Sequence, residues 1–233
     1  KKYIFTQEDK ANYCHLYKKY FKTKYILVIR DPRATFAGSF NVHKTWNLNK
    51  TYSFDRPLGN WLTAEQFVKK NKNNKVYILQ NEKFQGILKL KKEMKKLSKW
   101  LNIKYSKELT KPTFFRKIWH GDSSYLEWGE KKKPLPKNYY NLKNIKRRWK
   151  SKLNDEQILD IEMLLFYSMK KYGYRLENNV TTLNLSKAYY RILFSYKEKY
   201  NFFQNIYYTI KNVIRRILIL TNPSYAAKLV DLD

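Results

Sequence analysis

The sequence predicts an α/β protein, because two short apolar runs alternate with longer stretches that have helical periodicity. The first run, Tyr25 to Ile29, is rich in β-branched residues and ends at the charged turn that Arg30 begins, which is typical of a strand buried on both faces of a parallel sheet. The second run covers Val76 to Leu79 and has the same character. We therefore expect a central parallel sheet flanked by helices.

Helical patterns precede, separate and follow these two runs, and they cover residues 10–20, 34–42, 61–70 and 88–101. Asn102 follows the last of these patterns and is a suitable C-terminal stop. Asn154 and Gln157 form a capping-box pattern, which predicts a further helix running towards Gly173.

Two segments are expected to be irregular. Residues 47–57 are polar and turn-rich, and the Arg56-Pro57 pair predicts an extended kink in a loop. Residues 111–141 contain several prolines and aromatic residues, and an irregular segment of this length is usually functional.

The C-terminal part of the chain, residues 178–233, is expected to be a helical tail on a domain that spans residues 1–177. It contains amphipathic stretches at 186–200 and 201–220. In the second stretch apolar residues line one side, while Lys211 and Arg215 lie on another. Such a helix can lie on an anionic membrane or dock on its own domain; the pattern fits both, and we favour docking.

The charge of the chain is strongly positive, with 49 Lys and Arg against 19 Asp and Glu in 233 residues, a formal net charge of +30. Such a charge is typical of proteins that bind nucleic acid, anionic membranes or acidic substrates. The lysines are spread along the whole chain and accompany many Asn, Tyr and Ile residues, so background composition is the favoured explanation over a dedicated polyanion surface. With 43% hydrophobic residues, the chain has enough apolar material for a globular core.

The single cysteine, Cys14, excludes an intrachain disulfide and is compatible with a reducing compartment, so we expect a cytoplasmic protein with peripheral membrane contact left open. No run of 18 or more apolar residues occurs, which argues against a membrane-spanning helix. The three histidines and the cysteine lack the close spacing of zinc ligands, and we expect no metal.

The run Arg30-Asp31-Pro32-Arg33 follows the first predicted strand, where open α/β sheets bind their ligands. An arginine at this position can bind two phosphate oxygens at once, and the amides at the start of the next helix favour anions. The sequence therefore predicts an anion site. The alternative is an arginine that pairs with Asp31 or a neighbouring carboxylate.

The segment IRDPRATFAGSF, residues 29–40, resembles the motif of PAPS-dependent sulfotransferases in which an arginine and a downstream serine bind the 3′-phosphate of the donor. Asp9-Lys10 lies about one helix upstream and is similar to the Asp-Lys or Glu-Lys segments of carbohydrate-type members. Further similar motifs follow in the family's order at 76–82, 101–103, 111–113, 119–124, 148–153 and 172–174. The resemblance covers residues 3–176 and implies a three-layer P-loop-like fold.

The resemblance implies that PAPS is bound through Arg30, Ser39 and Asn81, with two departures from the family pattern. The family's serine lies eight positions after the arginine, which is Gly38 here, and Ser39 is one step of about 100° further round a helix. Asn81 stands where many members have a tyrosine, so its amide can hydrogen-bond adenine but cannot stack on it.

The resemblance also gives Asp9 the role of base, with Lys10 orienting donor or acceptor. Glu8 and His15 are alternative bases, and Asp9 as a helix cap is a further alternative. Three residues of the long irregular segment are expected either to close over the 3′-phosphate or a sugar, or to be solvated: Arg116, Lys117 and Ser123.

One part of the donor site has no counterpart in the sequence. No glycine precedes Gly38, so residues 1–37 lack the usual amide nest for the 5′-phosphosulfate. The sequence also begins with Lys1 rather than Met. We therefore expect an N-terminally truncated sulfotransferase.

The expected activity is transfer of a sulfuryl group from PAPS to a hydroxyl or amine of a small-molecule, glycan or glycolipid acceptor, without specific nucleic-acid binding. Two alternatives remain open: a basic module that binds nucleic acid or another polyanion, and a nucleotide kinase of related fold, which would need a Walker loop upstream.

Overall fold

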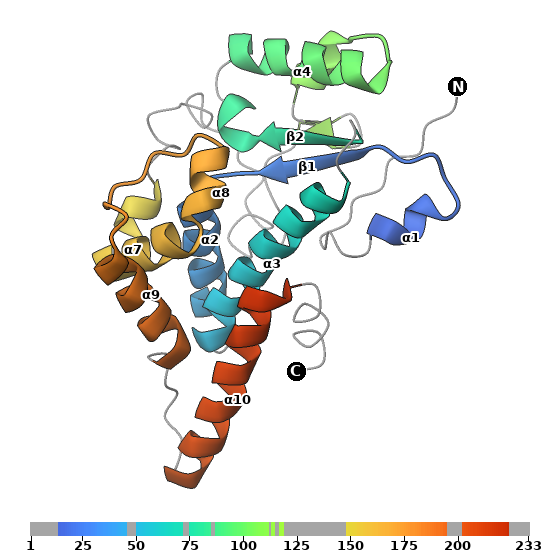
Figure 1. Cartoon of the computed structure of the whole chain (residues 1–233). Coiled ribbons are helices and arrows are strands. Elements are labelled where there is room, and N and C mark those ends of the chain that lie inside the picture. Colours follow the sequence, from blue (N-terminus) through green and yellow to red (C-terminus); the bar gives the residue numbers. More distant parts are fainter. Residues whose placement is uncertain are drawn as a thin grey trace.

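The computed structural model describes residues 14–45, 50–71, 75–84, 87–111, 113–114, 117–118, 148–194 and 202–223. The part of the chain it describes is mostly helical, with a small parallel sheet (Figure 1). The elements in chain order are α1 (Cys14–Lys18), β1 (Tyr25–Ile29), α2 (Pro32–Thr45), α3 (Lys50–Lys70), β2 (Val76–Gln80), η2 (Asn81–Phe84), α4 (Ile87–Leu101), η3 (Lys107–Thr110), β3 (Thr113–Phe114), β4 (Lys117–Ile118), η4 (Arg148–Ser151), α7 (Asp155–Leu164), α8 (Phe166–Lys171), α9 (Thr182–Phe194) and α10 (Phe202–Thr221).

The sheet consists of β1 and β2, which pair in parallel with Tyr25 opposite Val76 and Ile29 opposite Gln80. Both strands were predicted from their apolar runs, and the parallel α/β arrangement is confirmed. The described residues do not show the expected larger central sheet, because their parallel sheet has two strands. A separate antiparallel pair, β3 and β4, lies in the segment expected to be irregular.

Helices flank the parallel pair on both sides, with α4 on one side and α3 on the other (Figure 1). On the first side the ring of Tyr77 packs on Trp100 of α4, and on the other Tyr25 packs edge-on against Phe67 of α3. The prediction that β1 is buried on both faces is wrong, since Val28 is 61% exposed and Ile26 is 37% exposed. Ile26 is paired with Tyr77, so their side chains lie on the same face of the sheet. Helix α4 covers this face at the neighbouring strand β2, where Trp100 packs on Tyr77.

The apolar core lies where α2, α3, α7, α9 and α10 meet. Phe36 of α2 and Phe54 of α3 pack at a centroid distance of 4.8 Å, and both are buried. The loop expected at 47–57 is wrong over 50–57, where α3 continues through Pro57. Phe54 and Leu58 lie one helical turn apart and are buried, so their packing outweighs the roughly 3 kcal/mol cost of proline inside a helix.

The capping box at the start of α7 is confirmed, because Asn154 accepts from the Gln157 amide and the Gln157 side chain accepts from the Asn154 amide. The single helix expected from there to Gly173 is instead two helices, α7 and α8, divided at Leu165. The buried side chain of Leu165 belongs to the core, and its backbone departs from helical geometry with φ −112° and ψ 17°.

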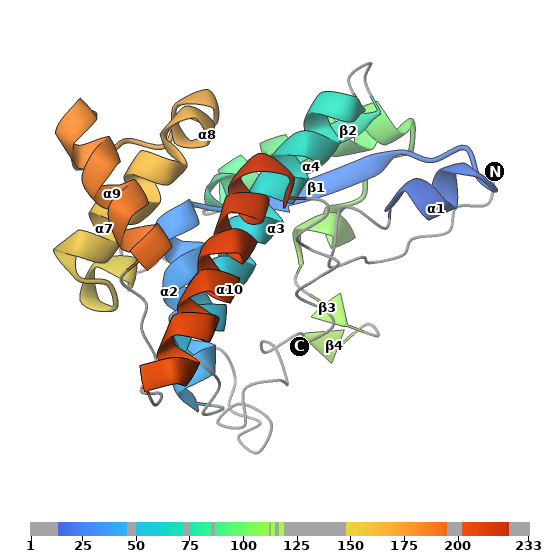
Figure 2. The same ribbon diagram turned by 60° about the horizontal axis from the view of Figure 1, so that its bottom comes forward.

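The end of α4 is also confirmed, because Asn102 has a positive φ of 59° and Ile103 donates to the carbonyl of Ser98. In the tail, α10 runs along α3 (Figure 2) and contacts α9 as well. Arg216 and Ile219 of α10 are buried. Docking of this helix on the domain is therefore confirmed. In the part of the chain that the structure describes, no helix has both the length and the apolarity to cross a bilayer.

Candidate functional site

The carboxyl ends of β1 and β2 meet at one edge of the sheet, because the strands are parallel and in register. Asp31 follows β1 closely, and Glu82 lies in the short helix after β2. The Asp31 amide donates to Glu82 Oε1 at 2.7 Å, which ties the two strand ends together. Tyr174 donates to Glu82 Oε2 at 3.0 Å, and burial followed by the charge of Glu82 raises the pKa of Tyr174 far above its ordinary value.

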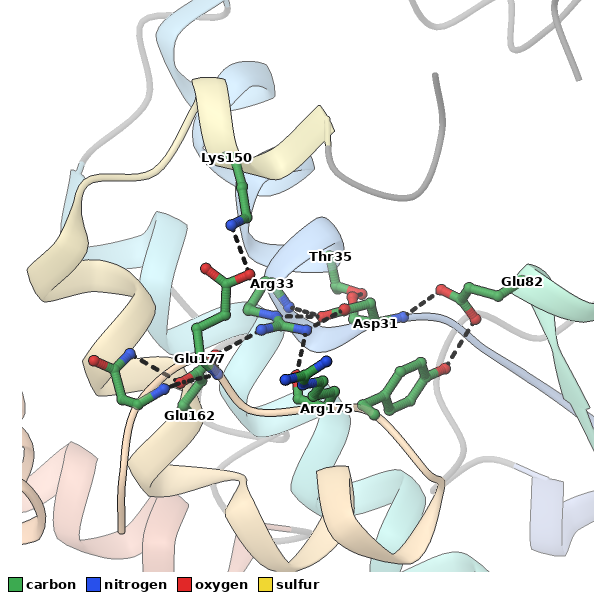
Figure 3. Close-up of polar contacts among 10 residues, drawn as sticks. Asp31, Arg33, Thr35, Glu82, Lys150, Glu162, Arg175 and Glu177 are labelled. Atoms are coloured by element: carbon green, nitrogen blue, oxygen red, sulfur yellow. Dashed lines mark hydrogen bonds and ion pairs between the residues drawn. The ribbon is translucent and has the colours of Figure 1, made fainter. Parts of the chain in front are cut away.

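Arg33 lies at the centre of a buried ion-pair network at this edge (Figure 3). Its guanidinium contacts Asp31 through Nε and Nη2 at 3.0 and 2.7 Å, and it donates through Nη1 to Glu162 at 2.6 Å. It also lies 4.2 Å from the centre of the Trp149 ring. Burial opposes the charge, but the hydrogen bonds and charges of Asp31 and Glu162 outweigh it and raise the pKa of Arg33.

Glu162 links this network to the segment after Tyr174. Its carboxylate accepts from the backbone amides of Glu177 and Asn178 and from the Asn178 side chain. Arg33 Nη2 also donates to the carbonyl of Arg175. The network therefore fastens residues 175–178 to the end of β1, as Figure 3 shows.

Asp31 also caps α2, and this changes the expected anion site. Its Oδ1 accepts from the Arg33 amide at 3.0 Å, and Pro32 before it has no amide hydrogen. The Thr35 amide donates to the Asp31 carbonyl. The amides of Arg33 and Thr35 are therefore directed at Asp31, and for these two the expectation that they point outward to a phosphate is wrong.

Arg30 has a different environment from Arg33. It is half-buried, and its guanidinium donates to the carbonyl of Ala34 at 2.7 Å and to Thr35 Oγ1 at 3.3 Å. A Cβ atom on Gly38 would lie only 2.7 Å from Arg30 Nη2. The guanidinium therefore lies along the first turns of α2, directly against the position where the sulfotransferase motif has its serine.

The other predicted site residues form two groups, and the first consists of Asn81 and Ser39. Asn81 is exposed and directly follows Gln80, just as Arg30 follows Ile29, so both lie at the same edge of the sheet. Ser39 is half-buried in α2, one step beyond Gly38.

The remaining candidates are not brought into this site by the described structure. His15 lies in α1, and Lys117 lies in β4, where its backbone pairs with Phe114. Five predicted residues lie outside the described part of the chain: Glu8, Asp9, Lys10, Arg116 and Ser123.

The sequence-based prediction missed the roles of Arg33, Glu162 and Tyr174. One signal for Glu162 was present, because it lies at helical spacing between Ile158 and Leu165 and so falls on the apolar stripe of its helix. A carboxylate at such a position needs a buried cation. Nothing in the spacing identified that cation, since 129 residues separate Glu162 from Arg33.

Within the described ranges, no group of three or more His, Cys, Asp or Glu residues is arranged to hold a metal ion. No protein-family model matches the chain, and it matches no curated protein or solved structure with which it was compared. A functional assignment therefore depends on the chemistry of its own residues, chiefly the cation Arg30 directly after β1.

Proposed function

We propose that this chain carries the 3′-phosphate-binding part of a PAPS-dependent sulfotransferase with a three-layer P-loop-like fold. The supporting observation is the contact between Arg30 and Gly38 at the carboxyl end of β1. The sulfotransferase motif needs the arginine and the position eight residues later to share one phosphate. In this chain the two positions are neighbours in space, on the first turns of α2.

The residues at this edge fit the nucleotide end of the donor. Arg30 provides a planar guanidinium that can hold two phosphate oxygens, and Ser39 provides a hydroxyl in the next turn. Asn81 offers an amide to the adenine edge. Asp31 and Arg33 take no part in this binding, because they are bonded to one another and to Glu162.

The proposed reaction is sulfuryl transfer to a hydroxyl or amine, with a glycan or glycolipid as the favoured acceptor class. PAPS supplies the sulfuryl group. As the acceptor atom bonds to sulfur, the bond from sulfur to the bridging oxygen breaks, its electron pair stays on that oxygen, and adenosine 3′,5′-bisphosphate leaves. The acceptor proton passes to a base, for which Asp9 is proposed, with Glu8 and His15 as alternatives. We propose Lys10, Arg116 and Lys117 as cations around the transferred group and the 3′-phosphate.

Binding of adenosine 3′,5′-bisphosphate tests the proposal directly. The full chain should bind this nucleotide more tightly than adenosine 5′-monophosphate, which lacks the 3′-phosphate, in isothermal titration calorimetry. Arg30→Ala should weaken binding by about 10- to 100-fold, because hydrogen bonds to charged groups contribute about 1.5–3 kcal/mol. Lys92→Ala removes one exposed positive charge from α4 and serves as the matched control.

Equal affinity for the two nucleotides would refute the 3′-phosphate site, and unchanged binding by Arg30→Ala would refute the role of Arg30. The register can be tested separately with Ser39→Ala, which should weaken binding if Ser39 supplies the hydroxyl. Gly38→Ser places a hydroxyl at the family's position and moves the flexible end of Arg30 aside. Stronger binding by Gly38→Ser together with unchanged binding by Ser39→Ala would reassign the hydroxyl to position 38.

The net charge of +30 supports one alternative, a module that binds nucleic acid or another polyanion. Such a module would bind RNA or heparin with a steep dependence on salt. A basic sulfotransferase can also adhere to heparin, so adherence alone does not discriminate. Competition by adenosine 3′,5′-bisphosphate favours the sulfotransferase, and its absence favours the polyanion module.

A further inference from the structure

The tail helix α10 exposes an apolar stripe on the side that faces away from the domain. Ile210, Ile214 and Ile217 are 55%, 53% and 46% exposed. They lie four and seven residues apart, so they form one row along the helix. Exposed isoleucines in a continuous row are unusual on a water-facing surface and indicate an interaction site.

The opposite side of α10 contacts the domain. Arg215 and Arg216 donate to the two carboxylate oxygens of Asp55 at 2.6 and 3.2 Å. Ile219 is fully buried in the core. The isoleucine row is therefore not the docking face of the helix, and α10 remains attached to the domain while the row faces outward.

The preceding helix, α9, repeats this division. Its exposed row contains Leu183, Tyr190 and Phe194, which are spaced at two and three helical turns. Its inner row contains Ala188 and Ile192, which are buried. Figure 1 shows α9 and α10 at the lower end of the helical part of the molecule, and Figure 2 shows α10 along α3.

The charges on the two helices are divided in the same way. Neither α9 (Thr182–Phe194) nor α10 (Phe202–Thr221) contains an acidic residue. The inner arginines are bound to carboxylates, with Arg191 on Asp160 and Arg216 on Asp55. The lysines, Lys187 and Lys211, are exposed beside the apolar rows. Apolar rows flanked by exposed lysines on docked helices are typical of proteins that bind the surface of an anionic membrane.

Charge also indicates which kind of partner can bind these exposed apolar rows. A second copy of the chain would carry the same formal net charge of +30 and the same exposed lysines beside its apolar rows, and like charges repel. A nucleic acid gains little from isoleucine side chains, which neither donate hydrogen bonds nor stack on bases. An anionic bilayer supplies both an apolar layer for the isoleucines and phosphates for the lysines.

We infer that the outer faces of α9 and α10 form a peripheral binding surface for anionic lipid bilayers. The helices lie in the interfacial plane, with the apolar rows in the outer acyl region and the inner rows on the domain. This surface is independent of the proposed sulfotransferase site, since it shares no residue with it.

Co-sedimentation of the full chain with vesicles tests this surface. The chain should bind vesicles of phosphatidylcholine containing a quarter of phosphatidylglycerol, and it should bind pure phosphatidylcholine at least tenfold more weakly. The triple variant Ile210→Ser, Ile214→Ser, Ile217→Ser should lose at least tenfold in affinity for the anionic vesicles at unchanged net charge. Lys187→Gln and Lys211→Gln should each weaken binding by about fivefold.

A matched control removes exposed apolar side chains elsewhere: Leu16→Ser, Leu88→Ser and Tyr167→Ser, which lie 55%, 80% and 77% exposed on other helices. It should bind like the unaltered chain, and thermal melts by circular dichroism should show that both triple variants are folded. Absent binding, or equal binding by the isoleucine variant, would overturn the inference. Light scattering that shows a dimer dissociated by the isoleucine variant would overturn it in favour of a second copy.

Discussion

Two buried ion-pair clusters hold distant parts of this molecule together, and they are built in opposite ways. The strand-end cluster consists of Asp31, Arg33 and Glu162, so two carboxylates surround one cation. The tail cluster consists of Asp55, Arg215 and Arg216, so two cations surround one carboxylate. In each cluster the residue of the minority charge contacts both others and is almost fully buried.

The excess charge of the strand-end cluster is balanced by the backbone. Amides of Arg33, Glu177 and Asn178 donate to its carboxylates, which fixes the backbone at the end of β1 and at residues 175–178. The tail cluster joins α3 and α10 through their side chains, and Arg216 also donates to the carbonyl of Leu193 in α9. The first cluster therefore shapes the edge where Arg30 lies, whereas the second holds α10 in place.

The largest predicted effect is that of Arg33→Ala, which leaves two buried carboxylates without their cation. Removing one partner of a buried ion pair costs about 3–5 kcal/mol, so the free energy of unfolding in urea should fall by that amount. Glu177→Gln is the control, because its pair with Lys150 lies at the surface and should contribute less than about 1 kcal/mol. Equal effects of the two variants would show that the strand-end cluster does not organise the fold.

Asp55→Asn should have the next largest effect, about 1.5–3 kcal/mol, because asparagine keeps an acceptor but loses the charge that faces two arginines. Its effect should be concentrated on α10. Amide hydrogen exchange should therefore quicken in residues 210–221 and stay unchanged in β1. Faster exchange in both regions would show that the two clusters are coupled.

Tyr174→Phe removes one hydrogen bond beside the strand-end cluster and leaves the charges of the cluster intact. The variant loses the hydrogen bond to Glu82, which itself accepts from the Asp31 amide. The free energy of unfolding should fall by about 1 kcal/mol. A loss as large as that of Arg33→Ala would mean that Glu82, rather than Arg33, holds the end of β1.

Tyr77, which lies outside both clusters, gives the smallest predicted effect, a dependence on pH. Burial, together with the hydrogen bond to Glu93, raises the pKa of Tyr77 from 10 to about 12. Between these pH values the unfolded chain loses this proton while the folded chain keeps it, so Tyr77 favours the folded state less as pH rises. The stability advantage of the unaltered chain over Tyr77→Phe should therefore shrink from pH 10 upwards, as measured by urea unfolding at several pH values. A constant difference would contradict the raised pKa.

Local signals in the sequence predicted most of the elements. Strand β1, the capping box at Asn154 and the stop at Asn102 each depend on residues within one helical turn or one strand, and each is confirmed. The prediction of a loop around Pro57 is wrong, because the packing of α3 on α2 and α10 keeps that segment helical. The exposure of Val28 could not be predicted from the sequence either, because it depends on which helix covers which strand.

Within the candidate site, the sequence predicted only the position of the residue that the motif at 29–40 itself supplies. Arg30 lies at the strand end as expected. The sequence suggested that an arginine could pair with Asp31, but it did not show that this arginine is Arg33. The carboxylate that completes the pair, Glu162, comes from a helix far along the chain, and only the packing of α7 on α2 brings them together.

The separation of Arg33 and Glu162 has a consequence for the order of events during protein synthesis. Arg33 leaves the ribosome 129 residues before Glu162, which at 5–20 residues per second is about 6–26 s. During that interval Asp31 is the only carboxylate of the strand-end cluster that has been made. The end of β1 therefore reaches its final arrangement only when residues 175–178 have also emerged. Folding of this edge is a late event of translation, although its strand is among the first elements made.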